Sequence, residues 1–285
     1  MNVFREAFRG PAREQTFTRI KTAVVFLAGT VTAVSMSVTG IGAQVAMAPM
    51  LSWMLGFKPD KAQAIATRYA LFVSSGAVIG ILMRNIEPDA YFLRGLILML
   101  CATLGAMLAA PLAPRPDMLA RRQLLQTIGM GVALFTLLQA LRISALHPSI
   151  ALAQWDQLWQ LGLIGLATGT LTQAMGLASG ILMVPGVYFV SGLSVHHSVA
   201  LSTYVILLAL PLPVYSYARQ GLTASEYSNP AALGGVLGGL TGGYLLGSIP
   251  EKGVLIVFAL MAMFFCAREV ARIAAERSAD RARVL

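Results

Sequence analysis

The chain has 285 residues, of which 57% are hydrophobic and 12% are charged, and its mean hydropathy is +0.72. The charged share is about half that of an ordinary soluble domain, which excludes a water-soluble globular protein. The formal net charge of +9 comes from basic residues that flank apolar runs, without an aromatic-rich basic face, so it does not indicate nucleic-acid binding. A membrane-spanning helix takes roughly 20 apolar residues, so the length allows about eight spans.

Ten apolar segments, five in each half, predict an all-α polytopic membrane protein. They lie at 22–38, 45–57, 61–83, 91–110 and 123–141, and then at 158–175, 181–193, 195–217, 230–247 and 254–266. The predicted units are a tail at 1–21, a transmembrane repeat at 22–141, a polar linker at 142–157, a second repeat at 158–267 and a tail at 268–285. Basic residues crowd both tails and the stretch 115–122, which predicts that both termini are cytoplasmic.

The two halves match at a constant offset of 136 residues. This offset aligns identical residues that include glycine and proline, which hydrophobic composition alone does not explain. Internal repeats are a recurring feature of transporter folds, so we expect two pseudo-symmetric repeats of four to five helical segments each. The identical pairs are Gly40 and Gly176, Met47 and Met183, Pro49 and Pro185, Gly56 and Gly192, Ala64 and Ala200, and Thr67 and Thr203.

The second segment of each repeat is too short to span a bilayer. Segment 45–57 reaches only about 20 Å as a helix, against a hydrocarbon core of about 30 Å. Each short segment follows a glycine-rich stretch, at 39–44 and 176–180, and contains a proline, Pro49 or Pro185. Paired, interrupted segments of this kind mark the binding sites of transporters and predict a structural break in each repeat. The alternative is that the glycines serve only close helix packing.

The count of crossings decides how the repeats are related. If each short segment crosses the membrane, the repeats are inverted, and the basic stretch 115–122 lies on the same side as both tails. If the short segments re-enter, the repeats are parallel and this stretch lies outside. The charge distribution favours the inverted arrangement.

The duplicated pattern resembles the TauE/SafE family of sulfite exporters. The first copy has the glycine-rich stretch that starts at Gly40, then Pro49, Gly56 and the run 64–67; the second has the stretch that starts at Gly176, then Pro185, Gly192 and the run 200–203. Both glycine-rich stretches depart from the family's pattern, at Ala43 and Gln44 and at Ala178 and Ser179. The resemblance covers about residues 22–270.

The resemblance implies a secondary transporter in the bacterial inner membrane. Its cargo would be a small sulfur-containing anion such as sulfite, thiosulfate or an organosulfonate, with protons as the coupling ion. It implies no catalytic residue, metal or cofactor. Two alternatives remain open. An anion channel would share the same electrostatics, whereas an integral membrane enzyme would need clustered carboxylates or histidines that the sequence lacks.

Backbone groups at the two interruptions are the predicted anion ligands. A helix N-terminus carries roughly half a positive charge and unpaired N–H groups, so an interrupted helix forms a cradle for an anion. This reasoning selects Gly40, Gly42, Gln44, Gly176, Ser179 and Gly180 as substrate-binding candidates.

Four side chains on the following segments complete the predicted site. Arg68 lies inside the segment 61–83, where a charge is costly and usually marks a pathway or a site. Thr67 is its neighbour, and the repeat places Thr203 and Tyr204 at the equivalent positions. The alternative for Arg68 is that its side chain reaches the lipid headgroups. His196 and His197 are candidates for carrying a coupling proton, or else polar residues at the membrane interface.

Overall fold

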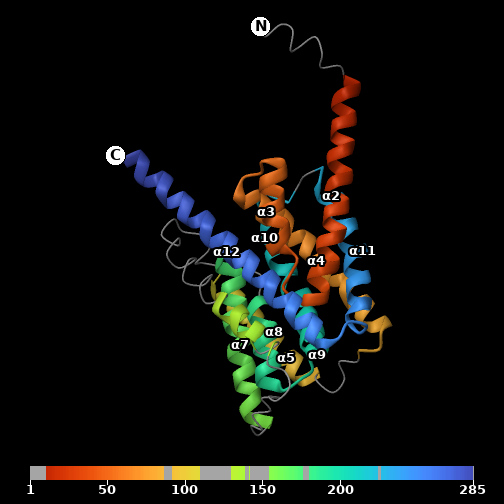
Figure 1. Ribbon diagram of the computed structural model, residues 1–285, viewed down its shortest axis with the longest axis vertical. Helices are drawn as coiled ribbons and strands as arrows, with labels where there is room; N and C mark the ends of the chain where they lie inside the picture. Colours follow the sequence, from red (N-terminus) through yellow and green to blue (C-terminus); the bar gives the residue numbers. More distant parts are fainter. Residues whose placement is uncertain are drawn as a thin grey trace.

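All of the regular structure described in the chain is helical. The computed structural model describes residues 11–86, 92–109, 130–138, 141, 154–175, 180–223 and 226–284. The helices labelled in Figure 1 are α2 (Pro11–Thr39), α3 (Gln44–Leu55), α4 (Pro59–Met83), α5 (Phe92–Ala109), α7 (Gln154–Met175), α8 (Gly180–Ser191), α9 (Val195–Ala209), α10 (Pro211–Arg219), α11 (Ser228–Leu246) and α12 (Glu251–Val284). A short helix lies at 130–138. No strand occurs in these ranges, so the predicted all-α fold is confirmed.

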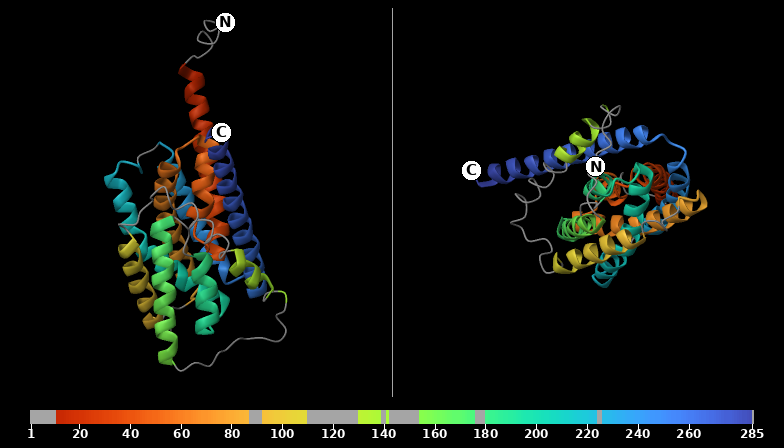
Figure 2. Two further views of the ribbon diagram at one scale, coloured as in Figure 1. Left: turned by 90° about the vertical axis from the view of Figure 1, so that its left-hand side faces the viewer. Right: turned by 90° about the horizontal axis from the view of Figure 1, so that it is seen from below.

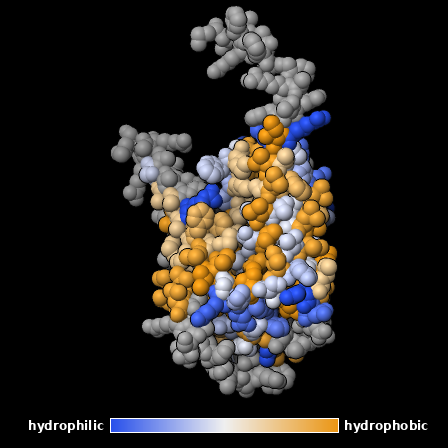
Figure 3. All heavy atoms as spheres, turned by 45° about the vertical axis from the view of Figure 1, so that its right-hand side comes forward, coloured by the Kyte–Doolittle hydropathy of each residue, from blue (hydrophilic) through white to orange (hydrophobic). Residues whose placement is uncertain are grey.

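Three helical stretches are long and apolar enough to cross a membrane: Arg19–Thr39, Asp60–Met83 and Val195–Arg219. Many large apolar side chains, such as Leu27 and Leu104, point outward. Figure 3 shows them as a broad apolar surface, with hydrophilic residues gathered toward its two ends. Such a surface is unfavourable in water, whereas lipid tails solvate it. The chain is therefore a membrane protein.

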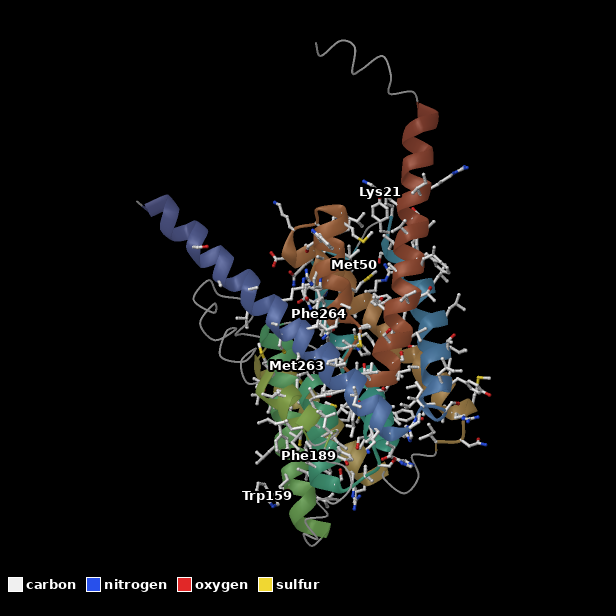
Figure 4. The ribbon with its side chains drawn as sticks, viewed as in Figure 1. Lys21, Met50, Trp159, Phe189, Met263 and Phe264 are labelled. Carbon is white, nitrogen blue, oxygen red and sulfur yellow. The ribbon has the colours of Figure 1, made fainter. Side chains whose placement is uncertain are left out.

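The first helices of the two halves run in opposite directions. Figure 4 shows Lys21, near the start of α2, at the upper end of the bundle and Trp159, near the start of α7, at the lower end. The last helix, α12, ends toward the upper end, where α2 begins (Figure 1). Because α2 begins at Pro11 and α12 continues to Val284, much of each predicted tail is helical. The extension of α12 is rich in Ala, Arg and Glu, which are strong helix formers.

The glycine-rich helix α11 lies between α2 and α4. A Cβ atom added at Gly238 would collide with the Thr30 carbonyl of α2, and one added at Gly239 would collide with the Val73 carbonyl of α4. Small residues let helix backbones approach closely in membranes, where van der Waals packing replaces the hydrophobic effect between helices. The glycine row toward α2 is Gly234, Gly238 and Gly242, and the row toward α4 is Gly235, Gly239 and Gly243.

The second half contains a similar close pair, α5 and α7. Gly169 of α7 lies against the Ala102 carbonyl of α5, so these backbones also approach without intervening side chains. Both views in Figure 2 show the helix at 130–138 beside α12. Its Phe135 ring lies 5.3 Å from the ring of Phe189 in α8. The short helices α3 and α8 thus lie among longer ones.

The predicted segment 195–217 is divided into two helices. α9 ends at Ala209 and α10 begins at Pro211. Pro211 and Pro213 have no backbone N–H to continue the ladder of hydrogen bonds, which explains why one long helix does not form. The equivalent helix of the first half, α4, has no proline after Pro59 and is continuous.

Candidate functional site

The first glycine-rich stretch separates α2 from α3. α2 ends at Thr39 and α3 begins at Gln44. Gly40 has a φ angle of +70° and Gly42 one of +97°, a backbone conformation that costs other residues about 1–2 kcal/mol. These two glycines therefore allow the chain to leave α2 and enter α3 within four residues.

The backbone between these helices is buried and offers hydrogen-bond donors. Ile41 is 0% exposed and Ala43 is 3% exposed. Among the described residues, no backbone carbonyl accepts a hydrogen bond from the N–H of Ile41, Gly42 or Ala43. Ala43, the N-cap of α3, has no side chain that caps the helix. Consecutive N–H groups of this kind form an anion-binding concavity, strengthened by the dipole of the helix that follows.

The start of α8 packs directly against this interruption. A Cβ atom added at Gly180 would collide with the carbonyl of Gly40 and the backbone of Ile41. Figure 4 shows Met50 of α3 in the upper half of the bundle and Phe189 of α8 in the lower half. The two short helices thus extend away from each other, and their N-terminal ends meet at Gly40, Ile41 and Gly180.

The helix α9 closes another side of the interruption. A Cβ atom added at Gly40 would lie 2.9 Å from Val184 Cγ2 of α8, 3.0 Å from Ser202 Oγ and 3.2 Å from Val199 Cγ1 of α9. Gln44, the first residue of α3, is 4% exposed. The surroundings of Gly40 are therefore tightly packed, with one hydroxyl among methyl groups.

The two prolines lie inside short helices rather than at interruptions. Pro49 lies within α3 and Pro185 within α8. Both helices continue past their proline, so these residues do not form the breaks that were expected at them; the gap between α2 and α3 lies earlier, at 40–43. Each proline leaves one carbonyl of the preceding turn without its helical partner.

The equivalent threonines form equivalent hydrogen bonds. Thr67 is 3% exposed and Thr203 is 5% exposed. Thr67 Oγ1 donates to the Gln63 carbonyl at 2.8 Å, and Thr203 Oγ1 donates to the Val199 carbonyl at 2.8 Å. Each hydroxyl proton is thus shared with the preceding turn of its own helix.

Arg68 and Tyr204 occupy equivalent positions but have different surroundings. The Arg68 guanidinium donates to Ser228 Oγ and to Asn229 Oδ1, both at 3.0 Å, at the start of α11. Its charge also lies 5.9 Å from the centre of the Phe72 ring. The buried Tyr204 hydroxyl has no hydrogen-bond partner in the described part of the chain. Arg68 is therefore held at the α4–α11 boundary, while Tyr204 retains a free hydrogen-bonding group.

The two histidines lie at the start of α9. His196 Nε2 is 2.8 Å from the Ile249 carbonyl, and its Nδ1 is 3.8 Å from Glu251 Oε1. His197 Nδ1 is 2.6 Å from Ser194 Oγ. His196 thus connects α9 with the start of α12. No cluster of potential metal ligands occurs in the searched ranges of the structure.

The chain matches the sulfite exporter TauE/SafE family over residues 25–269. It belongs to this family. No curated protein matches the chain. Because TauE/SafE is a family of transporters associated with sulfite-type anions, this TauE/SafE protein is a membrane transporter and not an enzyme. The resemblance inferred from the duplicated glycine and proline pattern is thereby confirmed.

The geometry of this TauE/SafE protein adds one residue to those predicted. Ser202 faces Gly40, but the repeat pairs it with Ala66, so a search for residues shared by both halves passes over it. A polar residue at helical spacing from Thr203 was the available signal. Of the predicted residues, Gly40 and Gly180 lie together and Arg68 contacts α11; Gly176 and Ser179 lie outside the described residues.

Proposed function

We propose that this protein is a secondary transporter that exports a small sulfur-containing oxyanion such as sulfite, thiosulfate or an organosulfonate. The anion binds near the membrane midplane, where the N-terminal ends of α3 and α8 meet. The observation that carries this proposal is the group of buried N–H donors at 41–43, next to Gly180. Two helix N-termini together offer roughly one unit of positive charge without a basic side chain.

An inverted duplication is supported by the helix boundaries. An offset of 136 residues carries the end of α2 onto the end of α7, and both ends of α3 onto those of α8. The same offset carries the start of α4 onto the start of α9, the end of α4 onto the end of α10, and the start of α5 onto the start of α11. The opposite directions of α2 and α7 agree with an axis in the membrane plane (Figure 4).

Polar side chains around the breaks complete the proposed site. Gln44, Thr67, Thr203 and Tyr204 would supply neutral hydrogen bonds, together with the second glycine-rich stretch, Gly176 and Ser179. Arg68 would attract the anion, because its two hydrogen-bond acceptors are neutral and no described carboxylate forms an ion pair with it. A guanidinium that keeps its net positive charge suits an oxyanion.

The proposed orientation puts both termini in the cytoplasm of a bacterial cell. α2 begins and α12 ends toward the same end of the bundle, and Arg19, Lys21 and Arg268 lie on those parts of the two helices. This distribution agrees with the positive-inside rule. With the cytoplasm negative, export of one negative charge is favoured by about 2.3 kcal/mol per 100 mV. Protons taken up through His196 or His197 would add to this driving force.

Flux into proteoliposomes tests the proposed function. Purified protein would be reconstituted, and the movement of labelled sulfite, thiosulfate, sulfate and a small sulfonate measured with and without a pH gradient. We expect saturable flux of at least one sulfur oxyanion, with counterflow that distinguishes a transporter from a channel. Flux equal to that of protein-free liposomes for all four anions would contradict the proposal. A gradient-independent rate would remove protons as the coupling ion.

A further inference from the structure

Ser202 provides the polar side-chain atom that faces the first interruption. Its side chain is 0% exposed, and its Oγ lies 3.0 Å from where a Cβ of Gly40 would be. The other two atoms nearest to this point are methyl carbons of Val184 and Val199. A buried hydroxyl among methyl groups, beside backbone that contains unpaired N–H donors, is placed to act together with those donors.

The hydrogen bond made by Ser202 is redundant for the helix. Ser202 Oγ donates to the Val199 carbonyl at 2.8 Å, and Thr203 Oγ1 donates to the same carbonyl at 2.8 Å. If Ser202 rotates away, the Val199 carbonyl keeps the bond from Thr203. Since leaving a buried acceptor unpaired costs about 1–3 kcal/mol, this shared acceptor removes the main penalty for redirecting the Ser202 proton.

The first half lacks this arrangement. At the equivalent position of α4 stands Ala66, and the Gln63 carbonyl accepts a side-chain hydrogen bond from Thr67 alone. A hydroxyl is therefore present on the α9 side and a methyl group on the α4 side. In a site formed by two similar halves, such a difference distinguishes one side of the ligand from the other.

We propose that Ser202 contacts the substrate and donates its hydroxyl proton to an oxygen atom of the bound anion. Through this directional bond, Ser202 selects oxyanions over spherical anions such as chloride, which helix dipoles alone attract without distinguishing. The inference rests on the proposed anion site at the meeting of α3 and α8, and it deepens that proposal by naming a specificity-determining side chain.

The test compares Ser202→Ala with Ser198→Ala in proteoliposomes. Ser198 is a matched control, because it is also 0% exposed on α9 and donates to a carbonyl of its own helix, that of Ser194, at 3.0 Å. A hydrogen bond to a charged group contributes about 1.5–3 kcal/mol, so Ser202→Ala should raise the KM for sulfite at least about tenfold. It should also lower the preference for sulfite over chloride in competition, whereas Ser198→Ala should change both by less than about twofold.

The outcomes separate this inference from the proposed function. If the wild-type protein moves sulfite and Ser202→Ala has the same KM and selectivity as Ser198→Ala, the role of Ser202 is overturned and the transport function stands. If the wild-type protein moves none of the anions tested, both proposals fail. Ser202→Ala removes a single oxygen atom, and its thermal unfolding midpoint, compared with that of Ser198→Ala, checks that the fold is retained. Ser202→Thr, which keeps the hydroxyl, should retain more of the sulfite preference than Ser202→Ala.

Discussion

The helix pair α4–α11 and its counterpart in the other half, α9–α10 with α5, share boundaries but differ in how they are joined. On α4, a Cβ atom at Gly76 or Gly80 would collide with carbonyls of α11, so these backbones are in direct contact. At the offset of 136 residues, Gly76 corresponds to Leu212 and Gly80 to Ser216. The backbone contact of the first pair has thus no counterpart in the side chains of the second.

This difference indicates which part of the transporter is rigid. α11 is joined to α2 and α4 by glycine rows, and Arg68 adds two hydrogen bonds to its start. On the other side, α9 and α10 are separate helices around Pro211. We expect α2, α4 and α11 to move as one unit, and α9–α10 to bend during the conformational change that exposes the site to alternate sides.

Exchanging residues between the two pairs should have the largest effect. Gly239 of α11 corresponds to Thr103 of α5. Gly239→Thr places a branched side chain against the Val73 carbonyl, and we expect it to destabilise the protein by about 3 kcal/mol or more or to prevent folding. The reverse change, Thr103→Gly, should cost only about 1 kcal/mol through helix propensity. Thermal unfolding in detergent measures both, and equal effects would remove the distinction between the pairs.

The equivalent residues Arg68 and Tyr204 should differ in what they stabilise. Arg68→Gln removes a charge and two hydrogen bonds to the start of α11, so we expect a loss of about 1 kcal/mol in stability, given its partial exposure. Sulfite flux at low concentration should fall at least about tenfold, since a bidentate cation is lost. Arg68→Lys should recover part of that flux.

Tyr204→Phe is the comparison for Arg68→Gln. Its hydroxyl has no partner in the described part of the chain, so its removal should leave the unfolding midpoint unchanged. Transport measured in parallel shows whether the hydroxyl meets the substrate. Unchanged flux for both Arg68→Gln and Tyr204→Phe would remove these two positions from the site.

The equivalent threonines should show the smallest and most similar effects. Thr67→Val and Thr203→Val each remove a hydroxyl that bonds to a carbonyl of its own helix, while that carbonyl keeps its backbone partner. We expect each change to alter stability by less than about 1 kcal/mol. A large loss of transport for one of them alone, at unchanged stability, would indicate that the substrate contacts only one half.

Much of the fold follows from the sequence, because glycine, proline and apolar run lengths constrain a backbone directly. The segments 45–57 and 61–83 predict α3 and α4 to within a few residues. Side-chain partners were harder to predict. That Arg68 contacts Ser228 and Asn229 depends on how α11 packs on α4, which no local pattern contains. Ser202 was missed because its importance comes from the approach of α9 to Gly40, a contact between distant segments.

The most direct test of the site is sulfite binding to Gly40→Ala and Gly56→Ala. Both glycines have positive φ angles, +70° and +66°, so both substitutions impose a similar backbone strain. A Cβ atom at Gly40 would meet Val184, Val199 and Ser202, whereas one at Gly56 would have nothing within 4 Å. Isothermal titration of the purified proteins should show wild-type affinity for Gly56→Ala and at least about tenfold weaker binding for Gly40→Ala. Equal affinity in the two variants would contradict an anion site at the meeting of α3 and α8.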